Sequence, residues 1–176
     1  MPNWCYNLLY VIPQGETGKE EFAAFERDNV VEGEDGSPQL TFRHILPPPD
    51  ERILDTADGY NGRIEGLPDG HSWAIETWGT KWGPRETVRL APDRHEMRYP
   101  ARGTVAIEFE TAWSPPKPVV LAWAKKYPHL LFALHYEEGG NLFIGDMEVL
   151  DGSVRVDAER RGRELSLHEM LNCRGG

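Results

Sequence analysis

Residues 104–157 switch repeatedly between the two side-chain periods that distinguish strands from helices. Thr104–Trp113 has a period of two, which predicts a half-buried strand. Its apolar face would carry Val105, Ile107, Phe109 and Trp113. Ser114 then precedes a stripe of helical period that Pro128 ends, so we predict a helix capped by Ser114. The stripe consists of Val120, Trp123, Ala124 and Tyr127.

Further strands are predicted after this helix, separated by short glycine turns. They cover Leu130–Glu138, Asn141–Leu150 and Ser153–Asp157. The connections Gly139-Gly140 and Asp151-Gly152 are typical of two-residue β-hairpins. Because hairpins join antiparallel neighbours, this part of the chain predicts an antiparallel sheet.

The N-terminal part has a similar order of elements. Asn3–Ile12 alternates aromatic and branched residues and predicts a strand. Thr17-Gly-Lys-Glu20 has the spacing of a capping box and predicts the start of a helix that ends near Asn29. Leu40–Leu46 predicts the next strand, which Pro47 halts.

Once an irregular segment is set aside, the order is strand, helix, strand, strand, helix, strand, followed by a hairpin. This is the order of a ferredoxin-like split βαβ sandwich, an α+β fold in which both helices cover one face of an antiparallel sheet. We predict a single domain over residues 1–158, an inserted tryptophan-rich segment over about 47–103, and a charged tail over 159–176. Short elements are predicted within these segments: strands at Ser72–Thr77 and Glu86–Leu90, and a helix at Leu167–Leu171.

The charge of the chain bears on its partners. The 176 residues include 29 acidic and 19 basic side chains, a net charge of −10. Such a charge opposes attraction to a phosphate backbone, so direct nucleic-acid binding is not expected. It favours encounter with a basic protein surface, including one that normally holds nucleic acid.

The sequence also predicts a cytoplasmic protein. It has no apolar run long enough to span a membrane, and its N-terminus lacks the pattern of a secretory signal. Cys5 and Cys173 have no zinc-ligand spacing and are expected to be free thiols. We expect Cys5 to be buried as a small hydrophobic residue.

Tryptophans concentrate beside glycines and prolines in two segments. The rings, with nearby cations, suit a planar or anionic ligand such as a nucleotide. The candidate ligand-binding residues are Trp78, Thr80, Lys81, Trp82, Arg85 and Trp113. The simpler interpretation is that Trp78 and Trp82 pack the irregular segment onto the sheet. Trp4 and Trp123 are expected in the core.

Acidic residues are predicted on the sheet face that the helices leave open. The candidate partner-binding residues are Glu108, Glu110, His135, Glu137 and Glu138. Paired carboxylates with a histidine can perform acid/base chemistry or bind a metal, but alternating glutamates on a solvated strand face are the usual arrangement. No nucleophile motif, phosphate-binding loop or metal-ligand spacing is present in the sequence. We therefore expect no catalytic residues, no metal and no cofactor.

Three separated motifs occur along the chain in this order: Met1-Pro-Asn-Trp-Cys-Tyr-Asn7, Trp78-Gly-Thr-Lys-Trp82 and Thr111-Ala-Trp-Ser-Pro-Pro116. Together they resemble the YubB-like family of bacterial plasmid and phage proteins. The resemblance spans most of residues 1–150. It implies a ferredoxin-like domain and a mobile-element setting, and it supplies no activity, cofactor or site residue to transfer.

Two functional hypotheses follow, and both leave the oligomeric state open. The first is a non-catalytic, acidic interaction protein of a mobile element that binds, and by binding inhibits, a host defence or nucleic-acid-handling protein. The second is a protein that binds a nucleotide-like anion through the tryptophan cluster. A hydrolase that uses the open-face Glu and His residues is a third, weaker hypothesis.

Overall fold

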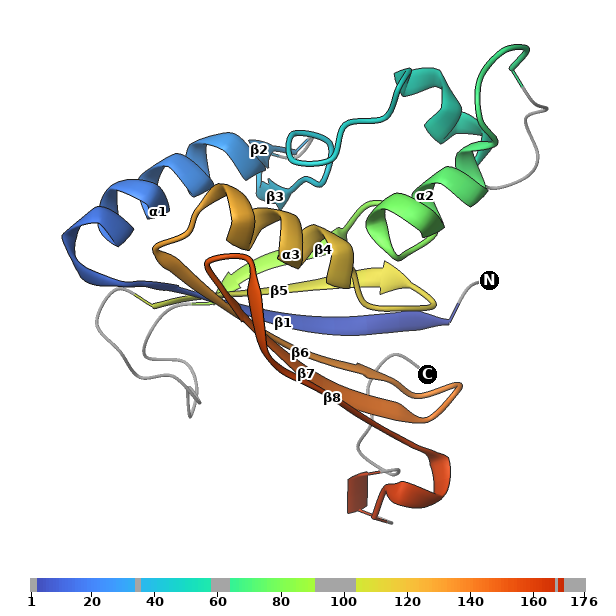
Figure 1. Ribbon diagram of the computed structural model, residues 1–176. Coiled ribbons are helices and arrows are strands. Elements are labelled where there is room, and N and C mark those ends of the chain that lie inside the picture. The colour runs from blue at the N-terminus through green and yellow to red at the C-terminus, as the bar shows by residue number, and fades with distance from the viewer. Residues whose placement is uncertain (1–2, 34–35, 58–63, 91–103, 167, 170–176) are drawn as a thin grey trace.

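The computed structural model describes residues 3–33, 36–57, 64–90, 104–166 and 168–169. Six strands form one antiparallel sheet in the order β4-β5-β1-β6-β7-β8. Helices α1, α2 and α3 all lie on one side of this sheet (Figure 1). The elements are β1 (Trp4–Pro13), α1 (Gly15–Asn29), β2 (Val30–Glu32), β3 (Pro38–Leu40), η1 (Glu51–Thr56), α2 (Gly70–Trp78), β4 (Arg85–Leu90), β5 (Val105–Ala112), α3 (Lys117–Lys126), β6 (Leu130–Glu138), β7 (Phe143–Leu150), β8 (Ser153–Arg161) and η2 (Gly162–Glu164).

The ferredoxin-like fold is confirmed, but one of its strands comes from another part of the chain than predicted. The strand order β4-β5-β1-β6 is that of the split βαβ unit, and β7 and β8 extend it as the expected hairpin. The predicted strand at Leu40–Leu46 is wrong: β3 ends at Leu40 and pairs only with β2 in a separate small sheet. The backbone then turns, because Ile45 N and Leu46 N both donate to the carbonyl oxygen of Phe42. The strand of the unit is β4, which lies within the predicted insertion.

The strand predicted at Ser72–Thr77 is also wrong, because this segment forms α2. The Asp69 carboxylate accepts a hydrogen bond from Ser72 N at 2.9 Å, which caps the N-terminus. Gly79, at φ 80°, ends the helix in the left-handed conformation. Between these caps, Ala74 and Trp78 lie on one buried face. The segment is short, and its caps decide its structure more than its apolar periodicity does.

Two predicted helix caps are absent. Helix α1 begins at Gly15, before the predicted capping box, and has no side-chain cap. Helix α3 begins at Lys117, after the prolines, while the Ser114 hydroxyl donates to the carbonyl oxygen of Gly79 at 2.6 Å. Ser114 therefore joins the β5–α3 turn to the end of α2. The helix predicted at Leu167–Leu171 falls largely outside the described residues.

The main core lies between the helices and the sheet. Trp123 is fully buried there, as predicted, with its ring edge-on to Phe25 and stacked on Phe132. Cys5 is buried and forms no disulfide among the described residues, also as predicted, and Cys173 lies outside them. The alternation of β1 places Cys5 and Asn7 on the helix side, so the open face receives Trp4, Tyr6, Leu8 and Tyr10.

Both edges of the sheet carry a β-bulge. The register shifts in β4 between Arg85 and Val88, and it shifts in the β7–β8 pair beside Val149. Bulges disturb the regular row of backbone donors and acceptors that would otherwise pair with another chain. In the part of the chain that the structure describes, no helix is both long and apolar enough to cross a membrane.

Candidate functional site

A pocket of about 420 Å³ lies where the turn after β3 meets the segment between α2 and β4. This volume is within the range of ordinary small-molecule sites. Residues 39–44 form one wall, Leu54 and Ala57 another, and residues 81–84 a third. The pocket lies within the long connection between α1 and β4, and its floor packs against the helix side of the sheet through Phe42 and Phe109.

The charged side chains that line this pocket are basic. Arg43, His44 and Lys81 line it, and none of the described lining residues is Asp or Glu. The chain as a whole carries a net charge of −10, so this local excess of cations runs against its composition. The pocket is therefore suited electrostatically to an anion.

The aromatic floor of the pocket is structural. Trp78 is only 2% exposed, and its indole Nε1–H donates to the carbonyl oxygen of Leu46 at 2.9 Å. Its ring meets Phe42 and Trp73 edge-on, with centroids 5.9 and 5.0 Å away. With its donor satisfied and its ring enclosed, Trp78 holds the turn after β3 against α2. The packing interpretation of Trp78 therefore fits the structure, and a stacking role does not.

Trp82 differs from Trp78 because it is half-buried and contributes to the pocket wall. The Lys81 ammonium lies over its ring, 4.5 Å from the centroid. Trp4 lies beside it, with centroids 6.0 Å apart and planes tilted by 40°. The Arg85 guanidinium covers Trp4 at 4.2 Å. The cations predicted near the indole rings are thus present, but in this structure each of them lies over a tryptophan of the protein itself. Trp4 was expected in the core and instead lies half-buried on the open side of the sheet.

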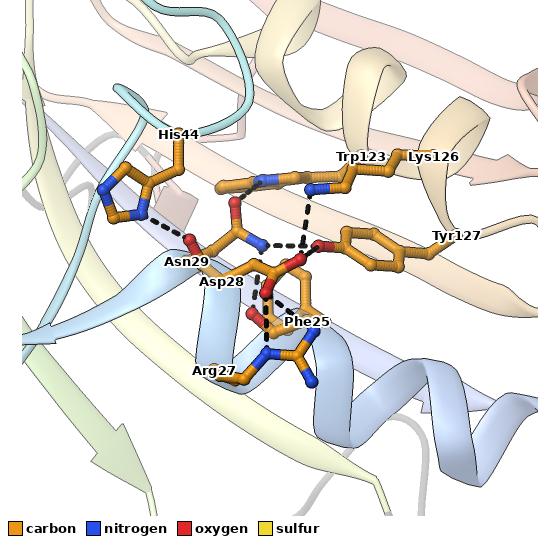
Figure 2. A network of polar contacts seen from close by, with 8 residues as sticks. All are labelled: Phe25, Arg27, Asp28, Asn29, His44, Trp123, Lys126 and Tyr127. Carbon is orange, nitrogen blue, oxygen red and sulfur yellow. Dashed lines mark hydrogen bonds and ion pairs between the residues drawn. The ribbon is translucent and has the colours of Figure 1, made fainter.

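His44 has a defined tautomer at the pocket wall. Its Nδ1 lies 2.6 Å from the carbonyl oxygen of Asp28 (Figure 2). A carbonyl oxygen can only accept, so Nδ1 carries the hydrogen and Nε2 is the remaining acceptor in the neutral ring. On protonation, Nε2 becomes a second donor. The neighbouring Arg43 pairs with Glu51 at 2.9 Å, and both side chains are more than half exposed.

A buried polar network holds the backbone that positions His44. Asn29 is fully buried, and its amide donates to the carbonyl oxygen of Phe25 at 3.0 Å and to Tyr127 Oη at 3.1 Å. Its Oδ1 accepts from Trp123 Nε1 at 2.8 Å. Figure 2 shows these side chains converging between α1 and α3. The C-terminus of α1, where Asp28 presents its carbonyl to His44, is therefore fixed by internal hydrogen bonds.

The Asp28 side chain adds charge to this network. Lys126 Nζ donates to its carboxylate at 3.1 Å and Tyr127 Oη donates at 3.0 Å. These two bonds, with a further one from Arg27, hold the pKa of Asp28 below its usual value. Burial acts in the opposite direction on the neighbouring phenol and raises the pKa of Tyr127. Both groups are therefore in their ordinary charge states at neutral pH.

The structure separates the predicted ligand-binding residues into two groups. Trp78, Lys81 and Trp82 line the pocket, whereas Thr80, Arg85 and Trp113 do not. Thr80 is fully buried and donates to the carbonyl oxygen of Ala112 at 2.8 Å. Its role is to join the end of α2 to β5, so it cannot contact a ligand there.

Arg85 and Trp113 lie away from the pocket for different reasons. Arg85 is on β4, where it covers Trp4 and forms an ion pair with Glu110 at 3.4 Å. Trp113 was predicted on the apolar face of its strand, but β5 ends at Ala112. The residue turns outward at φ 72° and is 44% exposed.

The predicted acidic residues are also divided. Glu108, Glu110, His135 and Glu137 are half-buried and share the open face. Glu138 is fully buried, and its carboxylate accepts from Gly140 N at 2.8 Å and Asn141 N at 2.6 Å. It closes the β6–β7 turn and is unavailable to a partner. The prediction that Glu138 binds a partner is therefore wrong.

The open-face residues make contacts with one another. The Tyr6 hydroxyl donates to Glu108, and His135 Nδ1 lies 3.0 Å from the Asp146 carboxylate. Among the described residues, no three side chains of His, Cys, Asp or Glu are grouped so that they could hold a metal ion. The expectations of no metal and no cofactor stay predictions.

Arg43 and His44 were missed by the sequence reasoning, which placed both in a strand. The available signal was a pair of basic residues directly after a buried aromatic, Phe42, and shortly before three prolines. Prolines restrict the residues before them and favour a turn over a central strand. Applied at Pro47, that rule also argues for a loop, where charged side chains are accessible.

Family comparison agrees with this architecture. The family model for the "Ferredoxin-like domain in Api92-like protein" matches residues 77–166, slightly more than half of the chain. The chain belongs to this Api92-like family. The crystal structure of a protein Api92 from Yersinia pseudotuberculosis is similar, with a TM-score of 0.56 and 8% sequence identity, covering 94% of this chain and 100% of that chain. At that identity, the likeness to Api92 shows the fold alone. No curated protein sequence matches the chain.

The match to the Api92-like family falls unevenly on the candidate site. It begins at Thr77 and therefore includes Lys81 and Trp82, but Arg43 and His44 precede it and lie outside the match. One wall of the pocket thus belongs to the matched ferredoxin-like domain. The walls formed by residues 39–44 and by Leu54 and Ala57 precede residue 77 and lie outside the family match.

Proposed function

We propose that this protein binds a small anionic molecule in the pocket between residues 39–44 and 81–84. The observation that carries the proposal is the lining: three basic side chains, Arg43, His44 and Lys81, and no carboxylate among the described residues of the wall. Apolar groups around a few placed polar ones are the usual composition of a ligand site. No catalytic step is proposed for it.

The position of the cations adds support. Within the described chain, Lys81 makes no ion pair, and its ammonium rests on the Trp82 ring. Arg43 is held by Glu51, but this pair is largely exposed and contributes little stability. Both cations can therefore turn toward a bound anion without a large loss elsewhere.

A screen of small anions by thermal shift and isothermal titration tests the proposal. The panel is citrate, inorganic phosphate, sulfate and nucleoside monophosphates. We expect at least one to raise the melting temperature, and Lys81→Met to reduce its affinity by about tenfold or more. Lys19→Met, on the exposed face of α1, is the matched control and should bind normally. Equal affinities in wild type and Lys81→Met, or no binding by any anion, would exclude the pocket as the site.

A second proposed function rests on the open face of the sheet. Glu110 and Glu137 lie on opposite sides of Tyr6 in the β5–β1–β6 register, and Glu108 pairs with Leu8 one step along. Three carboxylates on one side of adjacent strands suit a basic surface of another protein. The host partner would be a defence or nucleic-acid-handling protein that the binding inhibits. The YubB-like resemblance and its plasmid or phage setting support this version.

The open-face proposal is tested by capture from host lysate at low and moderate salt. We expect wild type to retain a basic protein, and the triple variant of Glu108, Glu110 and Glu137 to Gln to lose it. Glu16→Gln, an exposed substitution on α1, is the control. If wild type and the triple variant retain the same proteins, the face is not the interaction surface.

A further inference from the structure

Among the described residues that line the pocket wall, Trp82 is the one Phe, Tyr or Trp ring that is not almost fully buried. Phe42 and Trp78 are each almost fully buried, whereas Trp82 is half-buried. Trp82 is therefore the indole on which a planar ligand can stack. The Lys81 ammonium already lies over this ring, 4.5 Å from its centroid. A ligand that reaches the ring must displace the ammonium or share the ring with it.

The ammonium has a better partner available than the ring if the ligand carries an oxyanion. Charge-assisted hydrogen bonds to phosphate are stronger than a partly solvated cation–π contact. Arg43 and His44 line the same pocket and can supply further donors to such a group. Three cationic or protonatable side chains match a dianionic phosphate monoester better than a singly charged carboxylate.

These observations lead to one ligand class. We propose that the pocket binds a planar aromatic ring that carries a phosphate group, of the nucleoside monophosphate class. The ring stacks on Trp82 while Lys81 leaves that ring and donates to the phosphate. This inference rests on the proposed anion-binding function and specifies its ligand.

The geometry implies that ring and phosphate bind cooperatively. A nucleoside without phosphate has to displace the ammonium or share the ring with it, and gives it no new partner. Inorganic phosphate draws the ammonium away but leaves the indole face uncovered. A nucleoside monophosphate supplies both replacements, so its affinity should exceed that of either fragment by about tenfold or more.

Titration of adenosine 5′-monophosphate, adenosine and inorganic phosphate tests the inference. Isothermal titration and intrinsic tryptophan fluorescence give the affinities of wild type, Lys81→Met and Trp82→Leu. For Lys81→Met, we expect the monophosphate to lose about tenfold or more in affinity. Adenosine should bind this variant as well as wild type or better, because the ring is released. Lys81→Arg should restore much of the phosphate dependence.

For Trp82→Leu, the expected pattern is the reverse. Adenosine binding should disappear, the monophosphate should weaken, and phosphate should bind as before. Trp113→Leu is the matched control, because Trp113 is exposed but lies outside the pocket, and it should leave all affinities unchanged. The melting temperature of each variant establishes that it is folded before binding is compared.

The outcomes separate the inference from the function on which it rests. If citrate or phosphate binds the wild type as tightly as the monophosphate, the pocket is an anion site but the aromatic ligand class is wrong. The same conclusion follows if Lys81→Met weakens adenosine and the monophosphate equally. If none of the anions binds, both proposals fail together. Loss of phosphate discrimination in Lys81→Met alone supports the inference.

Discussion

Two clusters of aromatic and polar side chains lie near opposite ends of the connection between α1 and β4, and they differ in how completely their polar groups are paired. Around Asn29 and Trp123, each donor named above has an acceptor inside the protein, and both residues are fully buried. Around Lys81 and Trp82, the ammonium lies over a ring and makes no ion pair with the described residues, and both side chains are half-buried beside a pocket.

The difference shows that tryptophan content alone does not indicate a site. Trp78 and Trp82 are four residues apart and both line the pocket, yet Trp78 is 2% exposed and donates its N–H to Leu46, whereas Trp82 is half-buried. What separates them is whether the polar and charged groups nearby are already satisfied. We call the Asn29–Trp123 cluster the junction. Substitutions in the junction should chiefly lower stability, whereas substitutions in the pocket should chiefly lower ligand affinity.

The largest expected effect is at the centre of the junction. Trp123→Ala removes a fully buried ring and leaves the Asn29 carbonyl oxygen without its donor. We expect a loss of about 3–5 kcal/mol in the free energy of unfolding. Urea denaturation measures it. Trp82→Ala is the comparison and should cost less, because that ring is only partly buried. Similar losses in the two variants would refute the distinction between junction and pocket.

Asn29→Ala should be the next most severe change. It leaves Trp123 Nε1–H and Tyr127 Oη without their buried partner. An unsatisfied buried polar group costs about 1–3 kcal/mol, so the expected loss lies in that range. Because Asn29 adjoins Asp28, whose carbonyl holds His44, the variant should also weaken anion binding if the pocket proposal holds. Differential scanning calorimetry and the anion titration together measure both effects. Unchanged stability would mean that water replaces the lost bonds.

Much of this architecture could be predicted from local pattern. β6 extends over Leu130–Glu138 as predicted, and the Asp151-Gly152 turn has the positive φ angles that a two-residue hairpin needs. The burial of Trp123 was likewise evident from its helical stripe. These elements are long or strongly periodic, and Gly152 falls where its turn requires it. The two-residue turn predicted at Gly139-Gly140 is wrong, because β6 ends at Glu138 and β7 begins only at Phe143.

The errors concentrate where tertiary contacts decide the structure. The short strand predicted at Glu86–Leu90 is confirmed as β4, but its place in the sheet was not predicted, because its residues show no clean alternation and a bulge interrupts its pairing with β5. Trp113 was assigned to the apolar face of its strand by continuing the strand period past Ala112, where β5 ends. Glu138 is the last residue of β6, and its backbone hydrogen bonds in the following turn were not evident from the sequence. The pocket itself joins residues about forty positions apart, and no local pattern relates Arg43 to Lys81.

Glu138 offers a smaller and more local contrast. Glu138→Ala removes the acceptor of two backbone N–H groups in the β6–β7 turn, and we expect a loss of about 1–3 kcal/mol. Glu137→Ala, its neighbour on the open face, is the matched control and should change stability by about 0.5 kcal/mol or less. Thermal unfolding of the two variants provides the measurement. A greater loss in Glu137→Ala than in Glu138→Ala would show that the turn does not depend on this carboxylate.

The smallest expected effect is the pH dependence that Asp28 gives to the junction. Lys126 and Tyr127 hold the pKa of Asp28 below its unfolded value of about 4. A carboxyl group whose pKa is lowered by folding contributes stability above the unfolded pKa and loses it as the pH falls through the folded one. Asp28→Asn should therefore lower the melting temperature at pH 6 and approach wild type as both are acidified toward pH 2. Melting curves across this range give the comparison. A difference that stays constant with pH would mean that the contribution of Asp28 comes from its neutral hydrogen bonds, and that the junction is held by packing and amide contacts without help from charge.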